Sequence, residues 1–363
     1  MAANLKPLLG PAVAVSLAFL VGAAVLVATQ QSPIDVAGAI YQGAFGSSAA
    51  TLTTLAQTTP LLLVALSFAF AFRAGVFNAG GQGQFLMGAF AGAWAGFTPG
   101  LENLPAVVHV PLVMLAGALG GALWTLPPFV LKVVAGANEI LTTLMMSYVA
   151  DLTNQYLVLD IFRSAHIQAG TNAQTPNLVA SARFPELVAG SHLTIMLFLA
   201  LAAAVAVWLL YRNSVLGFEL RLMRTGALLA RSSGVQTSRR VFVAMTGSGA
   251  LAGLAGVALV TGFLGADITP LNTNVGFNGI LASLLVSNSP LLIPFAALFF
   301  AALEQGGIGL QIFTSTSPYI ADVVIATVIV FASARTVPAL RPKRLLQALR
   351  RRQGQQTVGG RRG

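Results

Sequence analysis

The chain contains many apolar runs that are long enough to cross a membrane. Such a span needs about 20 mostly apolar residues, and 56% of the 363 residues are hydrophobic while only 8% are charged. Soluble domains carry about 25% charged residues, and one aqueous core could not bury this much apolar surface. The sequence therefore predicts an all-α, polytopic integral membrane bundle of about 8–10 spans with broken or re-entrant segments. The candidate spans are 8–28, 52–72, 85–97, 107–131, 140–159, 193–211, 241–263 and 319–334, with two further short runs inside 276–303 that are split at 288–290.

A polar interruption lies between two of these runs, at residues 71–84, and is rich in glycine, asparagine and glutamine. An unpaired peptide group costs several kcal/mol in hydrocarbon, so irregular backbone at membrane depth occurs inside protein or beside a water-filled cavity. The interruption therefore indicates a solute pathway, although a tight interhelical turn is the alternative. Residues 275–280 repeat the pattern, which predicts a pseudo-repeat with a site between the two breaks.

The distribution of basic residues indicates how the chain is oriented. If the amino terminus is cytoplasmic, all of the 20 lysines and arginines except Arg163 and Arg183 fall on the cytoplasmic side, as the positive-inside rule requires. Both termini are then cytoplasmic in a bacterial plasma membrane, and 276–303 either crosses twice or forms a re-entrant hairpin. The formal charge of +10 is thus a topology signal and does not indicate a nucleic-acid partner. We expect a transmembrane domain over 1–340 and a basic, disordered cytoplasmic tail over 341–363.

Catalysis, metals and cofactors are not expected. The chain has no cysteine, and His109, His166 and His192 are far apart in the sequence, so no metal site is predicted. A P-loop needs a Gly-Lys-Ser/Thr sequence to hold phosphates, but none of the three lysines follows a glycine or precedes Ser or Thr. The chain is therefore not expected to be an enzyme or to hydrolyse ATP in this way.

One side of the helix predicted around 140–159 is polar. Its polar positions fall within an arc of about 120° if each residue turns the helix by about 100°. Ionisable groups inside spans are costly and usually face a watery cavity or the bundle interior, which favours a pathway-lining face. The alternative is a set of interhelical hydrogen bonds. The polar residues are Glu139, Thr143, Ser147, Asp151 and Asn154.

A transporter coupled to protons or sodium is the alternative function. It would need an indispensable carboxylate deep in the bundle, and Asp151 is the only fair candidate in the sequence. Glu304 and Asp322 lie near segment ends, where we expect them to reach water and to take no part in ion coupling.

The loop over 212–240 is basic and is expected on the cytoplasmic side. A short helix is predicted over 225–231, and a soluble partner could dock on such an element. The alternative is attraction to anionic lipid, which contributes about 1 kcal/mol per cation near the surface. The arginines of this loop are Arg212, Arg221, Arg224, Arg231, Arg239 and Arg240.

Several segments together resemble one family of membrane proteins. The stretches 71–84 and 136–146 are specific, and Thr59-Pro60-Leu61, Tyr148, Gly276-Phe277-Asn278-Gly279-Ile280 and Ser289-Pro290-Leu291 support them. These segments resemble the permeases of ABC uptake systems of the ribose/branched-chain amino-acid type, in the simple-sugar and nucleoside branch. The resemblance covers about residues 52–334.

The resemblance implies a permease that works with other subunits. These are a separate cytoplasmic ATPase, an external substrate-binding protein and a second permease, identical or related. The ATPase would dock on 212–240 and drive alternating access for a small polar solute, a nucleoside or a sugar. Two features depart from the family. The Gly-Glu-Asn-Pro helix start is missing from the docking loop, and a frequent glutamate of the glycine motif is Gln82 here.

Two sets of candidate residues follow from the sequence and the resemblance. Those expected on the solute pathway are Phe77, Asn78, Gly80, Gly81, Gln82, Gln84, Asn138, Glu139, Thr143, Ser147, Asp151, Phe277 and Asn278. Those expected to couple to the ATPase are Arg221, Arg224, Arg231 and Gly234.

Overall fold

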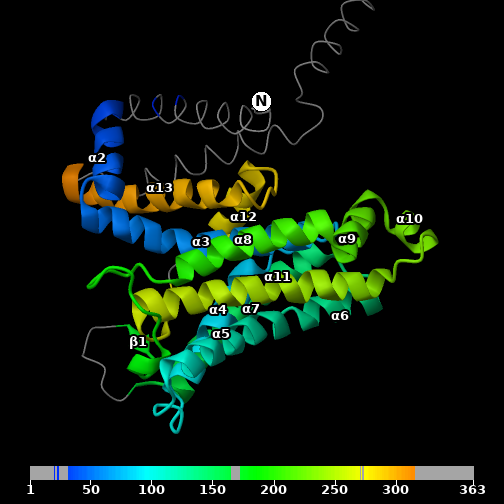
Figure 1. Ribbon diagram of the computed structural model, residues 1–363, viewed down its shortest axis with the longest axis horizontal. Coiled ribbons are helices and arrows are strands. Elements are labelled where there is room, and N and C mark those ends of the chain that lie inside the picture. The colour runs from blue at the N-terminus through cyan, green and yellow to red at the C-terminus, as the bar shows by residue number, and fades with distance from the viewer. Residues whose placement is uncertain are drawn as a thin grey trace, which may run out of the picture.

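The computed structural model describes residues 32–164, 172–269, 271 and 274–314, together with Leu20 and Ala23. Within them the chain is a bundle of long helices that run roughly side by side, with a single two-stranded ladder among the described residues (Figure 1). Five described helical segments are long and apolar enough to cross a membrane, so the predicted all-α polytopic membrane fold is confirmed. The predicted spans 8–28 and 319–334 and the tail over 341–363 lie outside the described residues.

The helices and strands have the following bounds. The first half contains α2 (Pro33–Phe45), α3 (Ser48–Arg73), α4 (Gly81–Phe97), α5 (Ala106–Leu123), α6 (Leu126–Ala135), α7 (Glu139–Tyr156), η1 (Leu157–Ile161), β1 (Ala173–Gln174) and η2 (Ala180–Ala182). The second half contains α8 (Met196–Asn213), α9 (Val215–Thr225), α10 (Ala227–Ser232), α11 (Thr237–Leu259), η3 (Val260–Leu264), β2 (Ile268–Thr269), α12 (Val275–Leu285) and α13 (Ile293–Thr314).

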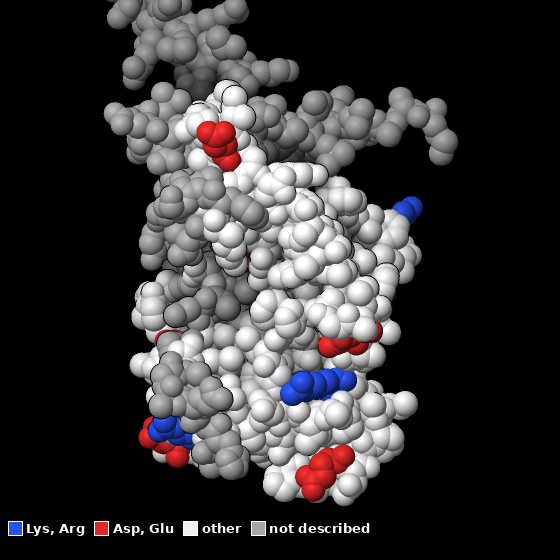
Figure 2. All heavy atoms as spheres, turned by 90° about the vertical axis from the view of Figure 1, so that its left-hand side faces the viewer, with Lys and Arg blue, Asp and Glu red and all other residues white. Residues whose placement is uncertain are grey.

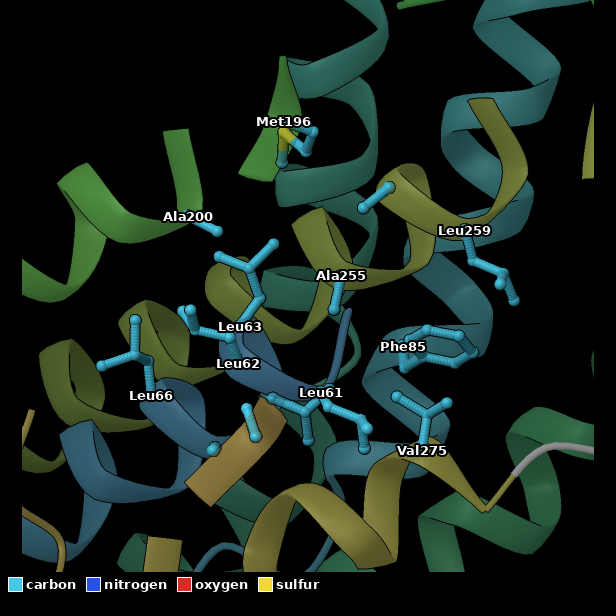
Figure 3. Close-up of a cluster of buried hydrophobic side chains, with 14 of the residues drawn as sticks. Leu61, Leu62, Leu63, Leu66, Phe85, Met196, Ala200, Ala255, Leu259 and Val275 are labelled. Atoms are coloured by element: carbon cyan, nitrogen blue, oxygen red, sulfur yellow. The ribbon is translucent and has the colours of Figure 1, made fainter. Parts of the chain in front are cut away.

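Helix α3 is the central helix of the bundle. Every residue from Thr58 to Ala71 is buried, as expected for a helix that is apolar on all sides. Figure 3 shows its leucines packed among side chains of α4, α8, α11 and α12, including Phe85 and Met196. Helix α11 packs along both α3 and α4, so these three helices form the centre of the bundle.

Small residues bring α4, α5 and α11 unusually close together. A Cβ atom added to Gly88 of α4 would lie 2.2 Å from the Cα of Gly253 in α11, and one added to Gly253 would lie 2.1 Å from the carbonyl oxygen of Gly117 in α5. Such contacts are possible only for glycine. Close backbone approach through small residues is how helices associate in a membrane, where lipid removes the hydrophobic driving force.

Helix α2 was not predicted from the sequence, because its 13 residues are too few for a span. Its start has ordinary helix signals, since the Ser32 hydroxyl accepts a hydrogen bond from the Asp35 N–H and Pro33 occupies the first turn. The helix packs on α13, where a Cβ atom on Gly43 would lie 2.7 Å from the Cα of Gly309.

Residues 276–303 divide within the region that the sequence predicted, around 288–290, into α12 and the first part of α13. The 11 residues of α12 extend only about 16 Å at about 1.5 Å per residue, which is about half of a bilayer core. The 22 residues of α13 are long enough to cross it. The two helices meet at a tight turn in which Ser287 and Asn288 have positive φ angles of 55° and 58°, so a half-length helix precedes a full-length one.

The predicted span over 107–131 is also divided, into α5 and α6. The break comes at Trp124 and Thr125, immediately before Leu126-Pro127-Pro128. The pair of prolines lies in the first turn of α6, where their missing N–H groups and fixed φ angles are tolerated, and so they mark the start of a new helix.

Candidate functional site

The polar break between α3 and α4 lies inside the protein. Asn78 is only 1% exposed, and its side-chain nitrogen donates to Gln84 Oε1 at 2.9 Å and to Ser248 Oγ at 2.8 Å. Gln84 Nε2 donates back to Asn78 Oδ1 at 3.0 Å, and the N–H of Gly80 donates to the same oxygen. Asn78 and Gln84 thus form a closed amide pair that satisfies the polar groups of the break.

The first turn of α4 contains the rest of the break. Helix α4 begins at Gly81, so Gln82 and Gln84 are helical and the short predicted span over 85–97 is extended by one turn. Gln82 Oε1 accepts a hydrogen bond of 2.7 Å from the N–H of Gly276, at the start of α12. The two polar breaks, far apart in the sequence, are therefore in direct contact. A Cβ atom on Gly276 would lie 2.4 Å from the Cα of Gln82, so this approach requires glycine.

A cavity of about 350 Å³ lies beside this contact, which is within the usual size range of sites for small molecules. It is bordered by three elements of the bundle, α4, α7 and the start of α12. Polar and aromatic groups share its wall. The lining residues are Gln82, Leu86, Ser147, Tyr148, Asp151, Leu271, Asn274 and Phe277.

The polar face of α7 divides between the two uses considered from the sequence. Thr143 Oγ1 accepts from the N–H of Ala79 at 3.1 Å, and Ser147 Oγ accepts from the N–H of Gly83 at 3.3 Å. These bonds attach α7 to the polar break and to the first turn of α4, and Ser147 also borders the cavity. Asp151 borders the cavity and accepts from Gln155 Nε2 at 2.9 Å. Thr143 is thus an interhelical contact, Asp151 is part of the cavity wall, and Ser147 is both.

The start of α7 lies outside the cavity lining. Asn138 caps the helix by accepting from the N–H groups of Ile140 and Leu141, and Glu139 forms a 2.8 Å ion pair with Lys132 of α6. These two residues, expected on the solute pathway, have evident structural roles at this end of the helix.

Two of the expected pathway residues on the breaks themselves also contact neighbouring helices. Phe77 packs edge-on against Phe68 of α3, with ring centroids 5.0 Å apart. Asn278 Nδ2 donates to Glu304 Oε1 of α13. Glu304 lies in the middle of α13 and bonds to α12, which corrects the expectation that it lies near a segment end. Asp322 lies outside the described residues.

Four lining residues were not among the predicted site residues. Tyr148 directly follows Ser147 and lies three positions before Asp151, so its place on the same side of α7 could have been read from helical spacing. Asn274 immediately precedes the second polar break. Leu86 and Leu271 carry no signal in the sequence that distinguishes them from other apolar residues.

The basic loop folds into α9 and α10 at the end of the bundle opposite β1 (Figure 1). The helix predicted over 225–231 is found as α10. Arg221 donates to the carbonyl oxygen of Tyr211 at 2.7 Å, and the guanidinium of Arg224 lies 4.7 Å from the centre of the Phe72 ring. Arg231 donates to Thr237 Oγ1, and Gly234 is exposed with a φ of 81°.

The same loop exposes two apolar side chains. Leu228 and Leu229 on α10 are 83% and 53% exposed. Two leucines side by side on a short, basic helix form a compact surface on which a partner could dock. Leu228 and Leu229 were not among the predicted coupling residues.

A family profile described as "Branched-chain amino acid transport system / permease component" matches residues 50–333. The guanosine ABC transporter permease protein NupP of Bacillus subtilis is 31% identical over 92% of this chain and 95% of its own length. The nucleoside ABC transporter permease protein NupB of Lactococcus lactis is 31% identical over 92% of both chains. The glucose ABC transporter permease protein TsgB13 of Haloferax volcanii is 32% identical over 88% of this chain and 86% of its own length. No solved structure matches the chain.

The match covers most of the chain, including both polar breaks, the polar helix α7 and the basic loop. The resemblance inferred from 71–84 and 136–146 is therefore confirmed. This chain belongs to the family of ABC transport-system permease components and is a membrane-spanning permease subunit of an ABC importer.

Proposed function

We propose that this chain forms the membrane pathway for a nucleoside or a simple sugar, and that the solute contacts the cavity between α4, α7 and α12. The support is the mixed chemistry of the cavity wall. Gln82, Asp151 and Asn274 offer hydrogen-bonding groups, and Phe277 and Tyr148 offer aromatic surface. A nucleoside has the same two characters, a polar sugar and a flat ring. The relatives are named for the transport of guanosine, nucleosides and glucose, which agrees with this solute class.

The pathway residues on the wall and those in the supporting contacts have different tasks in this proposal. Gln82, Ser147, Asp151 and Phe277 touch the passing solute. The other expected pathway residues keep the breaks and the helix ends beside them in place, through contacts within and between these elements. They are Phe77, Asn78, Gly80, Gly81, Gln84, Asn138, Glu139, Thr143 and Asn278.

Energy for transport comes from another subunit in this proposal. Membership of the family implies an ATPase and a substrate-binding protein as partners. The ATPase docks on α9 and α10 and contacts Arg221, Arg224, Arg231 and Gly234, and a second permease, identical or related, completes the membrane part. Closure of the ATPase moves the basic loop and drives alternating access at the cavity.

The proposed orientation puts α9 and α10 in the cytoplasm of a bacterial cell and both termini on the same side. The described surface at the other end of the bundle is largely uncharged, with scattered acidic and basic groups (Figure 2). Six arginines collect at the α8–α11 connection, and the positive-inside rule assigns such an end to the cytoplasm.

Uptake by cells that carry the complete transporter tests the proposal. Labelled guanosine, another nucleoside, glucose and a pentose would be compared in cells with the wild-type chain, with Phe277→Ala and with Phe295→Ala. Phe295 is an exposed phenylalanine of α13 outside the cavity and serves as the matched control. We expect Phe277→Ala to lower uptake of the true substrate at least about tenfold, the effect of losing roughly 1.4 kcal/mol, and Phe295→Ala to leave it unchanged. Equal uptake by all three would contradict the proposed pathway.

A further inference from the structure

Asp151 is the only charged residue among the described residues that line the cavity between α4, α7 and α12. Neither of the two ion pairs in the described part of the chain, Lys132–Glu139 and Arg240–Glu219, includes it. An ionisable group inside a membrane bundle is costly and usually contacts a partner or a water-filled cavity that has a function. The negative charge on this wall therefore needs an explanation beyond packing.

The carboxyl group of Asp151 is held by one neighbour and has room for others. Gln155, one turn further along α7, donates from Nε2 to Asp151 Oδ2 at 2.9 Å, which fixes the direction of the carboxyl group. In the described part of the chain, no residue donates to Oδ1. The two oxygens of an ionised carboxylate can accept about four hydrogen bonds. Asp151 can therefore accept hydrogen bonds from a solute that enters the cavity.

The other polar groups of the wall differ in how far they are already used. Ser147 Oγ accepts from the N–H of Gly83 and donates within its own helix, and Gln82 Oε1 accepts from the N–H of Gly276. Asn274 is the N-cap residue of α12, but its side chain makes no capping hydrogen bond and the residue is exposed. Asparagine is a preferred capping residue. Its amide is here left to face the cavity, where it offers both a donor and an acceptor.

A carboxylate binds best to a pair of neighbouring donors, because its two oxygens can then accept two hydrogen bonds in parallel. Ribonucleosides and simple sugars all carry such a pair, in the form of hydroxyl groups on adjacent carbon atoms. The two N–H groups on the edge of guanine are another pair, but guanine is the only one of the common bases that has them. The hydroxyl pair is therefore the partner that the whole solute class can offer to this wall.

We propose that Asp151 determines the specificity of transport by binding two neighbouring hydroxyl groups of the solute. Gln155 holds the carboxylate in position, and Asn274 bonds to a further polar atom of the solute. The base, or the apolar face of the sugar ring, packs on Tyr148 and Phe277, whose rings are exposed on the same wall. The inference rests on the proposed role of the cavity in solute passage, and it narrows the solute to one with adjacent hydroxyl groups.

The absence of cysteine from the chain allows a direct test on the assembled permease and ATPase in lipid nanodiscs. Leu271→Cys places one thiol on the cavity wall, at a residue that takes no part in the proposed contacts. A solute in the cavity slows the labelling of this thiol by a maleimide, and the solute concentration that halves the rate measures binding. Ala189→Cys, at an exposed position before α8, reports any effect of the solute on the reagent itself. The binding protein is left out, so that its own selectivity does not affect the result.

Three ribosides would each be compared with the form that lacks the 2′-hydroxyl group: adenosine, guanosine and methyl ribofuranoside. With Asp151 present, we expect each 2′-deoxy form to need at least about a tenfold higher concentration for half protection, since a hydrogen bond to a charged group contributes about 1.4 kcal/mol or more, which is tenfold. Asp151→Asn removes the charge and one acceptor, so this ratio should fall to about three or less. Asp160→Asn makes the same chemical change at an exposed position of η1 and should leave the ratio unchanged.

Four results would overturn the inference. The first is equal protection by the two forms of every riboside, or no protection by any of them, when Asp151 is present; this comparison does not depend on whether a variant of Asp151 folds. The second is a ratio that Asp151→Asn leaves unchanged. The third is protection by both forms of guanosine that Asp151→Asn abolishes, which would assign the carboxylate to the base. The fourth is a half-protecting concentration that follows the sodium concentration, which would assign it to a cation. Failure of the solute pathway itself would appear separately, as unchanged uptake by Phe277→Ala.

Discussion

The side-chain oxygen of Gln82 accepts a 2.7 Å hydrogen bond from the backbone N–H of Gly276, which is 194 residues further along the chain. The bond joins the first turn of α4 to the first turn of α12. Free N–H groups at the start of a helix need an acceptor, and for α12 that acceptor comes from the other polar break. The two breaks therefore stabilise each other, and the cavity lies where they meet.

Replacing Gln82 tests this contact. Gln82→Leu removes the acceptor and leaves the Gly276 N–H without it, which should lower the free energy of unfolding by about 1–3 kcal/mol and reduce uptake. Gln82→Glu keeps an acceptor oxygen at the same position, so its melting temperature in detergent should be close to that of the wild type. The contact would be unimportant if the two variants melted alike.

The close packing of α4, α5 and α11 predicts a strict requirement for glycine at position 253. Gly253→Ala would place a Cβ atom 2.1 Å from the carbonyl oxygen of Gly117, and overpacking of this kind typically costs about 1–3 kcal/mol. Gly38→Ala on α2 is the control, since nothing lies within 4 Å of its new Cβ atom. Thermal unfolding should show a lower melting temperature for the first variant and an equal or higher one for the second.

The buried amide pair predicts that Asn78 cannot become an aspartate. Asn78→Asp removes the donor to Gln84 Oε1 and Ser248 Oγ and puts a charge in a site that is 1% exposed. We expect a loss of about 2 kcal/mol or more in unfolding free energy and poor accumulation in the membrane. Asn213→Asp, at an exposed position at the end of α8, makes the same chemical change and should be tolerated within about 0.5 kcal/mol.

Docking of the ATPase can be tested at the exposed end of α10. Leu228→Ala removes a side chain that is 83% exposed and packs little within the subunit. The melting temperature of the isolated permease should therefore stay unchanged. The rate of solute-stimulated ATP hydrolysis by the assembled transporter should fall several-fold. Val107→Ala, at the start of α5 and 85% exposed, is the control outside α9 and α10. If both variants support full stimulation, the docking surface lies elsewhere.

Asp267, which is buried between η3 and β2, predicts a pH dependence of stability. Burial raises its pKa to about 7 in the fold from 3.8, so the unfolded chain loses the proton first as the pH rises. The contribution of Asp267 to stability is then fully present below about pH 4, falls by at most about 1.4 kcal/mol per pH unit, and is lost once the pH passes about 7. Thermal unfolding at pH 5 and pH 8 should show this fall for the wild type and a smaller one for Asp267→Asn.

The sequence was most informative for segments inside the hydrocarbon of the membrane, where few backbone conformations are possible. The run 52–72 became α3 and the run 193–211 became α8 within a few residues at each end, because a long apolar segment in lipid must satisfy its own backbone hydrogen bonds. Helix α2 was missed because a 13-residue helix does not meet the length that this argument uses. The division of 276–303 around 288–290 was predicted, but the full length of α13 was not, because the sequence analysis ended its second run at 303.

The residues of the candidate site also divide into features that the sequence predicted and contacts that only the structure revealed. From the sequence alone, the physics of the bilayer determined that the chain forms membrane helices, that a polar break lies within 71–84, and that polar groups gather on one side of α7. Only the tertiary structure decided that Asn78 and Gln84 bond to each other while Gln82 reaches α12, and that Asp151 borders a cavity while Asn154 meets Asp267. The direction of a polar side chain inside a bundle depends on which helix packs beside it, and that packing is set by contacts between residues far apart in the chain, such as Gly88 and Gly253.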